Sequence, residues 1–292
     1  MTLRSLYNEA RRRLSAAGID SPAFDAACLI ELVFGVNRGD LLVRGQEEAD
    51  AAGEEQFEAL LRRREAREPL QYLLGAWEFM DMSLKTGPGV LCPREETELL
   101  CQTVAGYLKD TPCRGLDLCA GTGAVALGIA RLCPKAEIQA VELSEQAAGY
   151  LRQNVETFGE GRVQVIMGDV LSPEFAARFA DGSLDFIASN PPYIASGELP
   201  GLQEEVQQEP SLALDGGEDG LVFYRAIAKL WAPKLRTGGV LAVEIGEEQA
   251  EAVSALFTEA GISCRTEQDF NGLDRVVHGC RTGTGYVADR LK

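Results

Sequence analysis

Histidine is almost missing from this 292-residue sequence, in which His278 is the only one. Histidine is the usual general base and metal ligand near neutral pH, so chemistry built on imidazole bases or histidine-bound metals is disfavoured. The eight cysteines contain no Cys-x-x-Cys pair and lie scattered through apolar segments, which argues against a zinc site and against a disulfide framework. We therefore expect no metal centre and interpret the cysteines as small buried hydrophobic residues.

Positive charge and long apolar runs are also scarce. The 28 lysines and arginines face 45 acidic residues, for a net charge of -17, and such a field repels phosphate backbones, so no direct nucleic-acid partner is expected. No apolar run approaches the roughly 18 to 20 residues that cross a bilayer, and no cleavable apolar segment follows Met1. We expect a cytoplasmic protein without a membrane partner, whose 46% hydrophobic content can fill a real core.

The first 75 residues are patterned as helices. Apolar side chains recur at helical spacing up to Leu14, and Gly18 can end that helix. A second helix is expected to begin at Ser21, which can cap it, with Pro22 in its first position. Further helical segments are expected at residues 40–43 and 54–68. We predict a small helical domain over residues 1–75.

The pattern changes after residue 76. Aromatic and apolar residues from Trp77 to Val90, punctuated by Gly87-Pro88-Gly89, indicate a β-hairpin, and we assign residues 76–94 to a hairpin linker. From 95 to 292, strands alternate with helices, which is typical of an α/β fold with a parallel sheet covered on both faces. The expected strands are residues 116–119, 138–142, 163–167, 184–189, 240–245, 262–266 and 275–280.

A glycine-rich turn follows the first of these strands and leads into a helix. Glycine lets the backbone approach a ligand closely, and the helix start presents free N–H groups, so we expect a nucleotide-type cofactor across this turn. The pattern alone also fits the dinucleotide fingerprint of dehydrogenases. The cofactor-binding residues expected in this segment are Asp117, Cys119, Ala120, Gly121, Thr122 and Gly123.

Two further strand ends carry acids that suit the same cofactor. Glu142 ends the second strand, where an acid can accept hydrogen bonds from both ribose hydroxyls. Asp169 follows the third strand and is expected at the adenine edge, with Val170 packed on the ring. A helix or turn cap is the alternative for Asp169, and a solvated strand end is the alternative for Glu142.

The tetrapeptide Asn190-Pro191-Pro192-Tyr193 follows the fourth strand, at the sheet edge where ligands of open α/β folds bind. Two prolines fix φ and remove two N–H donors, which leaves a stiff loop with free carbonyls. The Asn190 side-chain oxygen and a carbonyl, expected to be that of Pro191, can accept both protons of a planar amine or amide NH2. We predict that Asn190 also faces the cofactor, while Tyr193 stacks on the planar group. A proline-rich connection without substrate contact is the alternative.

Three longer segments narrow the choice of protein family. They are Arg67-Glu68-Pro69-Leu70-Gln71-Tyr72-Leu73-Leu74-Gly75, Gly89-Val90-Leu91-Cys92-Pro93-Arg94-Glu95-Glu96-Thr97-Glu98, and Glu209-Pro210 followed by Ala213-Leu214-Asp215-Gly216-Gly217-Glu218-Asp219-Gly220-Leu221. With the motifs above, they make residues 3 to 281 resemble the release factor glutamine methyltransferases, the PrmC/HemK family.

The resemblance implies a helical N-terminal domain that recognises the substrate, and a Rossmann-like, seven-stranded class I methyltransferase domain. It implies S-adenosyl-L-methionine as cofactor and, as acceptor, the side-chain nitrogen N5 of the glutamine in the Gly-Gly-Gln motif of peptide chain release factors, with an effect on translation termination. The chain departs from the family pattern at Cys119 and Ala120, where Gly-Thr is usual, and at Glu142, where aspartate is usual. Val170 stands where an aromatic residue is sometimes found.

Several alternatives stay open on the sequence alone. A ribosomal-protein glutamine or an exocyclic base amine of nucleic acid is another possible acceptor, and a nicotinamide-dependent oxidoreductase or a non-catalytic cofactor-binding module is a more distant reading. Arg94, Glu95 and Glu98 suit either a helix start or substrate contact. The Gly216-Gly217 segment fits either a flap over the acceptor or a turn before the next helix.

Overall fold

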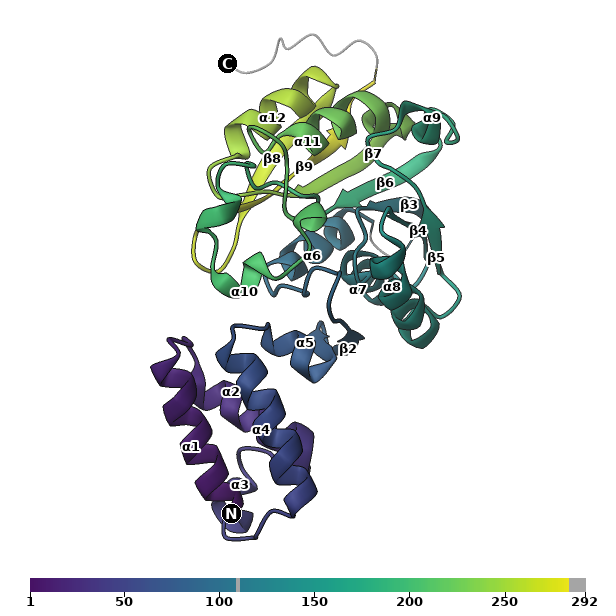
Figure 1. Cartoon of the computed structure of the whole chain (residues 1–292). Coiled ribbons are helices and arrows are strands. Elements are labelled where there is room, and N and C mark those ends of the chain that lie inside the picture. Colours follow the sequence, from purple (N-terminus) through teal and green to yellow (C-terminus); the bar gives the residue numbers. More distant parts are fainter. Residues whose placement is uncertain (109–110, 284–292) are drawn as a thin grey trace. The chain divides into compact units, whose positions relative to one another are not determined.

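The structure is a computed structural model that describes residues 1–108 and 111–283, and its chain forms two compact units (Figure 1). The first, here called the helical unit, consists of Met1–Ala76 together with Gln203–Gln208. The second, the sheet unit, consists of Trp77–Leu202 and the described residues from Glu209 onward. The hairpin therefore belongs with the sheet unit, and a short segment far along the chain completes the helical unit.

Helices α1, α2 and α4 pack together in the helical unit (Figure 1). Thr2 caps α1 by accepting the Ser5 N–H, and Asp50 caps α4 by accepting the Gly53 N–H. Because of the Asp50 cap, α4 begins three residues earlier than expected. Pro22 takes the first position of α2, but among the described residues Ser21 finds no side-chain capping partner, which corrects that prediction. The helices are α1 (Leu3–Ala16), α2 (Pro22–Phe34), α3 (Leu41–Arg44), α4 (Ala51–Glu65), α5 (Leu70–Leu74) and α10 (Glu204–Gln207).

A two-stranded sheet and a seven-stranded sheet make up the strands of the sheet unit. The hairpin pairs β1 (Ala76–Phe79) with β2 (Met82–Lys85). The large sheet has the order β5-β4-β3-β6-β7-β9-β8. Its strands are β3 (Cys113–Leu118), β4 (Ala136–Glu142), β5 (Val163–Met167), β6 (Leu184–Ser189), β7 (Leu235–Glu244), β8 (Ile262–Gln268) and β9 (Asp274–Arg281).

The large sheet is parallel except at one strand. β3, β4, β5, β6 and β7 run parallel, whereas β9 lies antiparallel to both β7 and β8. Only the short segment from Asp269 to Leu273 joins β8 to β9. Such a segment makes a hairpin, while a parallel connection needs a crossover of a dozen or more residues. The large sheet is therefore a seven-stranded mixed sheet.

Helices cover both faces of the large sheet (Figure 1). Along β6, Phe186 and Ala188 face one core with the hairpin and three helices, and Ile187 faces the other core. The first core is covered by α6 (Thr97–Leu108), α7 (Ala124–Leu132) and α8 (Glu145–Phe158). The second is covered by α9 (Pro173–Ala176), α11 (Val222–Ala226), the π-helical turn η3 (Ile227–Trp231) and α12 (Ala250–Glu259). Short 3-10 turns lie at Leu199–Gly201, Ser211–Ala213 and Ala232–Lys234.

The sheet register brings four strand ends to one edge. Leu118 pairs with Val141 on one side and with Ser189 on the other, and Ser189 pairs with Val243. Because these strands are parallel, the residues that end or follow β3, β4, β6 and β7 lie along the same edge, where ligands of such sheets bind. Over the described ranges, no helix is both long and apolar enough to cross a membrane.

Candidate active site

The glycine-rich turn begins at the end of β3 and is held in a left-handed conformation. Cys119, Gly121 and Gly123 have φ values of 65°, 56° and 87°. The Gly123 N–H donates to the Ala120 carbonyl over 2.7 Å, which closes the turn. A Cβ atom on Gly123 would lie 2.5 Å from the Leu151 Cδ1 atom, so both sterics and φ require glycine there. Cys119, a non-glycine residue at positive φ, is the strained member of the turn.

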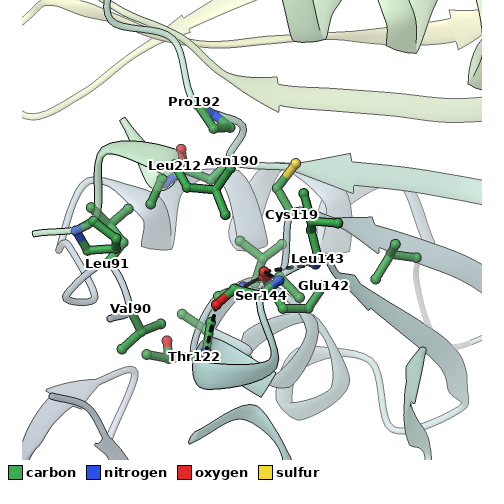
Figure 2. Close-up of a pocket in the computed structure, with 18 of the residues that line it drawn as sticks. Val90, Leu91, Cys119, Thr122, Glu142, Leu143, Ser144, Asn190, Pro192 and Leu212 are labelled. Carbon is green, nitrogen blue, oxygen red and sulfur yellow. Dashed lines mark hydrogen bonds between the residues drawn. The ribbon is translucent and has the colours of Figure 1, made fainter. Parts of the chain in front are cut away.

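This turn forms the floor of an open pocket of about 1140 Å3, its mouth included. Figure 2 shows Val90 and Leu91 on one side of the pocket and Glu142 and Leu143 on the opposite side. Predicted site residues that line the pocket are Cys119, Ala120, Gly121, Thr122, Glu142, Asp169, Val170, Asn190 and Pro192.

Glu142, the last residue of β4, has both carboxylate oxygens engaged by backbone donors. Oε2 accepts the Gly121 N–H over 2.8 Å, and Oε1 accepts the Leu143 and Ser144 N–H groups over 2.9 and 2.8 Å. A carboxylate oxygen has two acceptor positions, so this arrangement leaves one on Oε2. The geometry therefore accommodates one hydroxyl at this carboxylate, where the sequence pattern suggested two.

Asp169 and Val170 follow β5 and both line the pocket. Asp169 Oδ1 accepts the Leu171 N–H over 2.8 Å, and its carbonyl accepts the Ser172 N–H over 3.1 Å. The turn-capping role considered as an alternative is thus present, together with a position on the pocket wall. Val170 is 4% exposed, and its carbonyl accepts the indole N–H of the buried Trp231, which holds this corner in place.

Four of the predicted site residues are outside the set that lines the pocket: Asp117, Gly123, Pro191 and Tyr193. Asp117 is completely buried beneath the turn, with Oδ2 accepting the Ala126 N–H over 3.0 Å. Burial raises the pKa of Asp117 to about 8. Tyr193 packs against the second core, and burial raises the pKa of its hydroxyl. In this structure Tyr193 supports the loop from behind.

Asn190 directly follows β6 and lies on the pocket wall, as Figure 2 shows. Its Nδ2 atom donates to the Thr97 hydroxyl oxygen over 3.1 Å. Thr97, the first residue of α6, in turn donates to Glu244 Oε2 over 2.6 Å. Because Nδ2 is committed to Thr97, Oδ1 is the atom of this amide that can accept a hydrogen bond from a ligand.

The facing wall was not predicted to belong to the site. It comes from residues 89–94, whose shape is set by Glu209: this buried carboxylate accepts the Cys92 N–H over 2.9 Å and pairs with Arg94. The signal for this wall is the Gly89–Glu98 family motif, in which Arg94, Glu95 and Glu98 suit either a helix start or substrate contact. Leu212 and Phe223 also line the pocket, and no sequence motif singled them out.

Glu98 and the Gly216-Gly217 segment, which lie outside the pocket lining, make structural contacts. Glu98 accepts the Met80 N–H over 2.9 Å, so it ties α6 to the hairpin. Gly216 donates to the Ile194 carbonyl over 2.8 Å, and the Gly217 carbonyl accepts the Ser196 N–H over 2.9 Å. These bonds make the Gly216-Gly217 segment a turn held against the chain that follows Tyr193.

The pocket residues fit S-adenosyl-L-methionine. Gly121 offers an open backbone position, since a Cβ atom there would meet only Val90 Cγ2, at 3.8 Å. One acceptor position remains on Glu142 for a ribose hydroxyl. The apolar Val170 and Leu143 line the same pocket as the Asp169 carboxylate, and together they suit a purine ring with its amine. A mostly apolar pocket with a few convergent polar groups is what such ligands require.

Comparison with known proteins agrees with this geometry. A family model for the PrmC N-terminal domain matches residues 5–75, and a methyltransferase small domain model matches residues 81–227. A release factor glutamine methyltransferase of Moorella thermoacetica is 40% identical over 282 residues, which cover 94% of this chain and 97% of that protein. The chain belongs to the release factor glutamine methyltransferase family.

A second member, from Geobacter sulfurreducens, is 36% identical over 95% of this chain and 96% of its own length. The crystal structure of a methyltransferase from Pyrococcus furiosus covers 75% of this chain and 98% of its own, with a TM-score of 0.53 and 17% identity, and supports the fold. As a family member, the protein is an S-adenosyl-L-methionine-dependent methyltransferase, which confirms the predicted enzyme class and cofactor.

Proposed function

We propose that this enzyme methylates the side-chain nitrogen N5 of a glutamine in peptide chain release factors, the glutamine of the Gly-Gly-Gln motif, and so modulates translation termination. The observation that carries the proposal is Asn190. This side chain stands on the pocket wall with Nδ2 held by Thr97 and with Oδ1 left to accept one proton of an acceptor NH2. The named relatives, each a release factor glutamine methyltransferase, support the choice of acceptor.

The chemistry needs positioning more than a strong base. An amide nitrogen is a weak nucleophile because its lone pair is delocalised into the carbonyl. If Asn190 Oδ1 and a backbone carbonyl of the Pro-Pro loop accept its two hydrogens, the remaining lone pair is directed at the methyl group, and this stiff loop holds that geometry from the start. S-adenosyl-L-methionine supplies an electrophilic methyl. The N–C bond forms as the S–C bond breaks, and one N–H proton of the methylated amide leaves to solvent.

We assign the remaining roles by unit. The helical unit, which carries the match to the PrmC N-terminal domain, is proposed to recognise the release factor. The sheet unit is proposed to hold the cofactor through the turn residues Cys119 to Gly123, with Glu142, Asp169 and Val170 around it. We place the enzyme in the cytoplasm, where release factors act, and propose that it works without direct contact to nucleic acid or membrane, in keeping with its net charge of -17.

A side-by-side assay tests the acceptor. Release factor, ribosomal protein and a DNA or RNA oligonucleotide are each incubated with the enzyme and labelled S-adenosyl-L-methionine, and the modified position is mapped by mass spectrometry. We expect label on the release factor alone, at a glutamine side chain. Label on a ribosomal protein or an oligonucleotide, with the release factor unlabelled, would replace the proposed acceptor while leaving the methyltransferase assignment in place.

A further inference from the structure

A chain of three side chains runs from the pocket wall into the core of the sheet unit. Asn190 donates through Nδ2 to Thr97 Oγ1 over 3.1 Å, and Thr97 Oγ1 donates to Glu244 Oε2 over 2.6 Å. Glu244 ends β7, which pairs with β6, and the Ser189–Val243 register pair places Asn190 and Glu244 on adjacent strand ends. Thr97 and Glu244 are 3% and 2% exposed. Thr97 also lines the pocket beside Asn190, whereas Glu244 is outside the set that lines it.

The direction of this chain follows from which atoms can donate. An ionised carboxylate only accepts hydrogen bonds, and a threonine hydroxyl has a single proton to give. Once Thr97 gives that proton to Glu244, its oxygen can only accept from Asn190. The Asn190 amide must therefore present its NH2 group to Thr97. If the Asn190 amide were rotated by half a turn, its oxygen would face a lone pair of Thr97 Oγ1. Its NH2 group would then face the NH2 group that accepts the methyl.

We propose that Thr97 and Glu244 are positioning residues for methyl transfer, which orient the Asn190 amide so that Oδ1 faces the acceptor NH2. This inference rests on the acceptor role proposed for Asn190. It explains why a carboxylate occupies such a buried position. A bond that merely held α6 to β7 could use a neutral partner, which would avoid the cost of burying a charge. Only a partner that has no proton to donate fixes the direction of the hydrogen bonds from Asn190 through Thr97.

The protonation of Glu244 links this orientation to pH. Burial raises the pKa of Glu244 to about 7. When protonated, Glu244 can donate to Thr97, which can then donate to Asn190 Oδ1 and hold the amide in the opposite orientation. Activity should therefore decline as pH falls below neutrality. The other titratable or charged groups around Glu244 are Glu96 and Cys101 at α6, Tyr193 after β6, Tyr224 on α11 and Arg275 on β9.

Three variants of the chain test the inference. Thr97→Val keeps the shape of the side chain but removes the hydroxyl, Glu244→Gln adds a donor, and Thr97→Ser keeps the hydroxyl. We expect kcat to fall about 10- to 100-fold in the first two, as for other small misplacements of catalytic groups. Cofactor affinity and KM for the release factor should change less than about threefold, and Thr97→Ser should restore most of the rate. Thr103→Val, on the same helix, is the matched control.

Two further readouts separate positioning from a structural role. If the chain acts as one unit, Thr97→Val with Glu244→Gln should be no slower than Thr97→Val alone. The decline of kcat on the acidic side of neutrality should disappear in Glu244→Gln. The proposal would be overturned if the two substitutions lowered kcat independently, so that their factors multiply in the double variant. It would also be overturned if kcat of Glu244→Gln still declined on the acidic side of neutrality. A lower melting temperature with wild-type kcat in the folded enzyme would overturn it as well.

Asn190→Ala, assayed in parallel, shows which proposal fails. If Asn190→Ala is inactive while Thr97→Val retains wild-type kcat, the positioning proposal is wrong and the acceptor role of Asn190 stands. If Asn190→Ala itself retains full activity, the acceptor role is wrong and the positioning proposal falls with it. Loss of kcat in both, with rescue by Thr97→Ser and a wild-type rate in Thr103→Val, is the result we predict.

Discussion

Buried carboxylates have different partners in the helical unit and at the ends of β3, β4 and β7, although elsewhere in the sheet unit the buried Glu209 pairs with Arg94. In the helical unit, buried acids meet buried bases: Arg64 contacts Asp25 over 2.7 Å and Glu205 over 2.9 Å. At the edge of the large sheet, Asp117 and Glu142 accept backbone N–H groups, and Glu244 accepts a hydroxyl. Burial still raises the pKa of Asp25 beside its arginine, so charge in either place is costly.

The difference separates carboxylates that stabilise the fold from carboxylates that serve the active site. An ion pair satisfies both partners and leaves little for a ligand, so it holds helices together. A carboxylate that takes neutral donors keeps its remaining lone pairs available to a cofactor or to a catalytic side chain. We therefore expect changes at the sheet edge to alter catalysis and binding first, and changes in the helical ion pairs to alter stability first.

The largest effect is expected from Asn190→Ala. Loss of the only acceptor oxygen on this side chain should lower kcat about 1,000-fold, by analogy with loss of a preorganised hydrogen bond to a reacting group. Calorimetry should find the affinity for S-adenosyl-L-methionine largely retained, because the glycine turn and Glu142 are untouched. Full activity in this variant would contradict the assigned role.

Arg64→Ala tests the other side of the comparison. Removing one partner of a buried pair leaves Asp25 without its counter-charge, so the free energy of unfolding of the helical unit should fall by about 3–5 kcal/mol. Urea unfolding followed by a probe in the helical unit measures this loss. Arg62→Ala is the control, because the Arg62–Glu58 pair lies on an exposed face and should contribute little. Equal losses in the two variants would remove the contrast between the two kinds of site.

Glu142→Gln should lower the affinity for the cofactor more than it lowers kcat. A glutamine has one carbonyl oxygen, so its NH2 group must face at least one of the backbone donors now bound by the carboxylate. Loss of a charge-assisted hydrogen bond predicts a Kd for S-adenosyl-L-methionine about tenfold higher, with kcat at saturation close to wild type. Glu145→Gln, at an exposed neighbouring position, serves as the control. An unchanged Kd would separate Glu142 from the cofactor site.

The last prediction concerns the pH dependence of stability and Asp117. Its pKa is raised to about 8 by burial, so the folded state holds this proton where the unfolded chain has released it. The stability that the proton contributes is complete below pH 4 and is lost as pH rises through 8, at up to about 1.4 kcal/mol per pH unit. Asp117→Asn should lack this loss between pH 5 and 8.

Urea unfolding of wild type and Asp117→Asn at several pH values measures that difference. Asp181→Asn is a suitable control, because Lys234 holds the pKa of the exposed Asp181 below its usual range, outside the interval tested. Parallel stability curves for wild type and Asp117→Asn would show that Asp117 is already ionised in the folded protein.

Most of the fold could be predicted because it rests on local patterns. The strands Val163–Met167 and Leu184–Ser189 match their predicted bounds, since short, mostly apolar runs between turn residues leave little choice. The start of β7 at Leu235 was missed because Arg236 to Gly239 interrupt its apolar pattern. The membership of residues 203–208 in the helical unit depends on contacts between Glu205 and two distant arginines, which no local pattern encodes.

The site was predictable where one motif supplies both position and chemistry, as in the glycine turn and at Asn190. It was not predictable where a side chain acts on another across the fold. Thr97 and Glu244 are 147 residues apart, and their hydrogen bond exists only because α6 packs against β7. The same holds for Glu209, which shapes the wall around Cys92 from 117 residues away.

The most direct test of the account is transfer of labelled methyl from S-adenosyl-L-methionine to purified release factor. The native Gly-Gly-Gln motif is compared with a version in which its glutamine is replaced by alanine. The account predicts label on the native protein only, at the glutamine side-chain nitrogen. Equal label on both proteins, or no label on either by an enzyme that binds the cofactor, would contradict it.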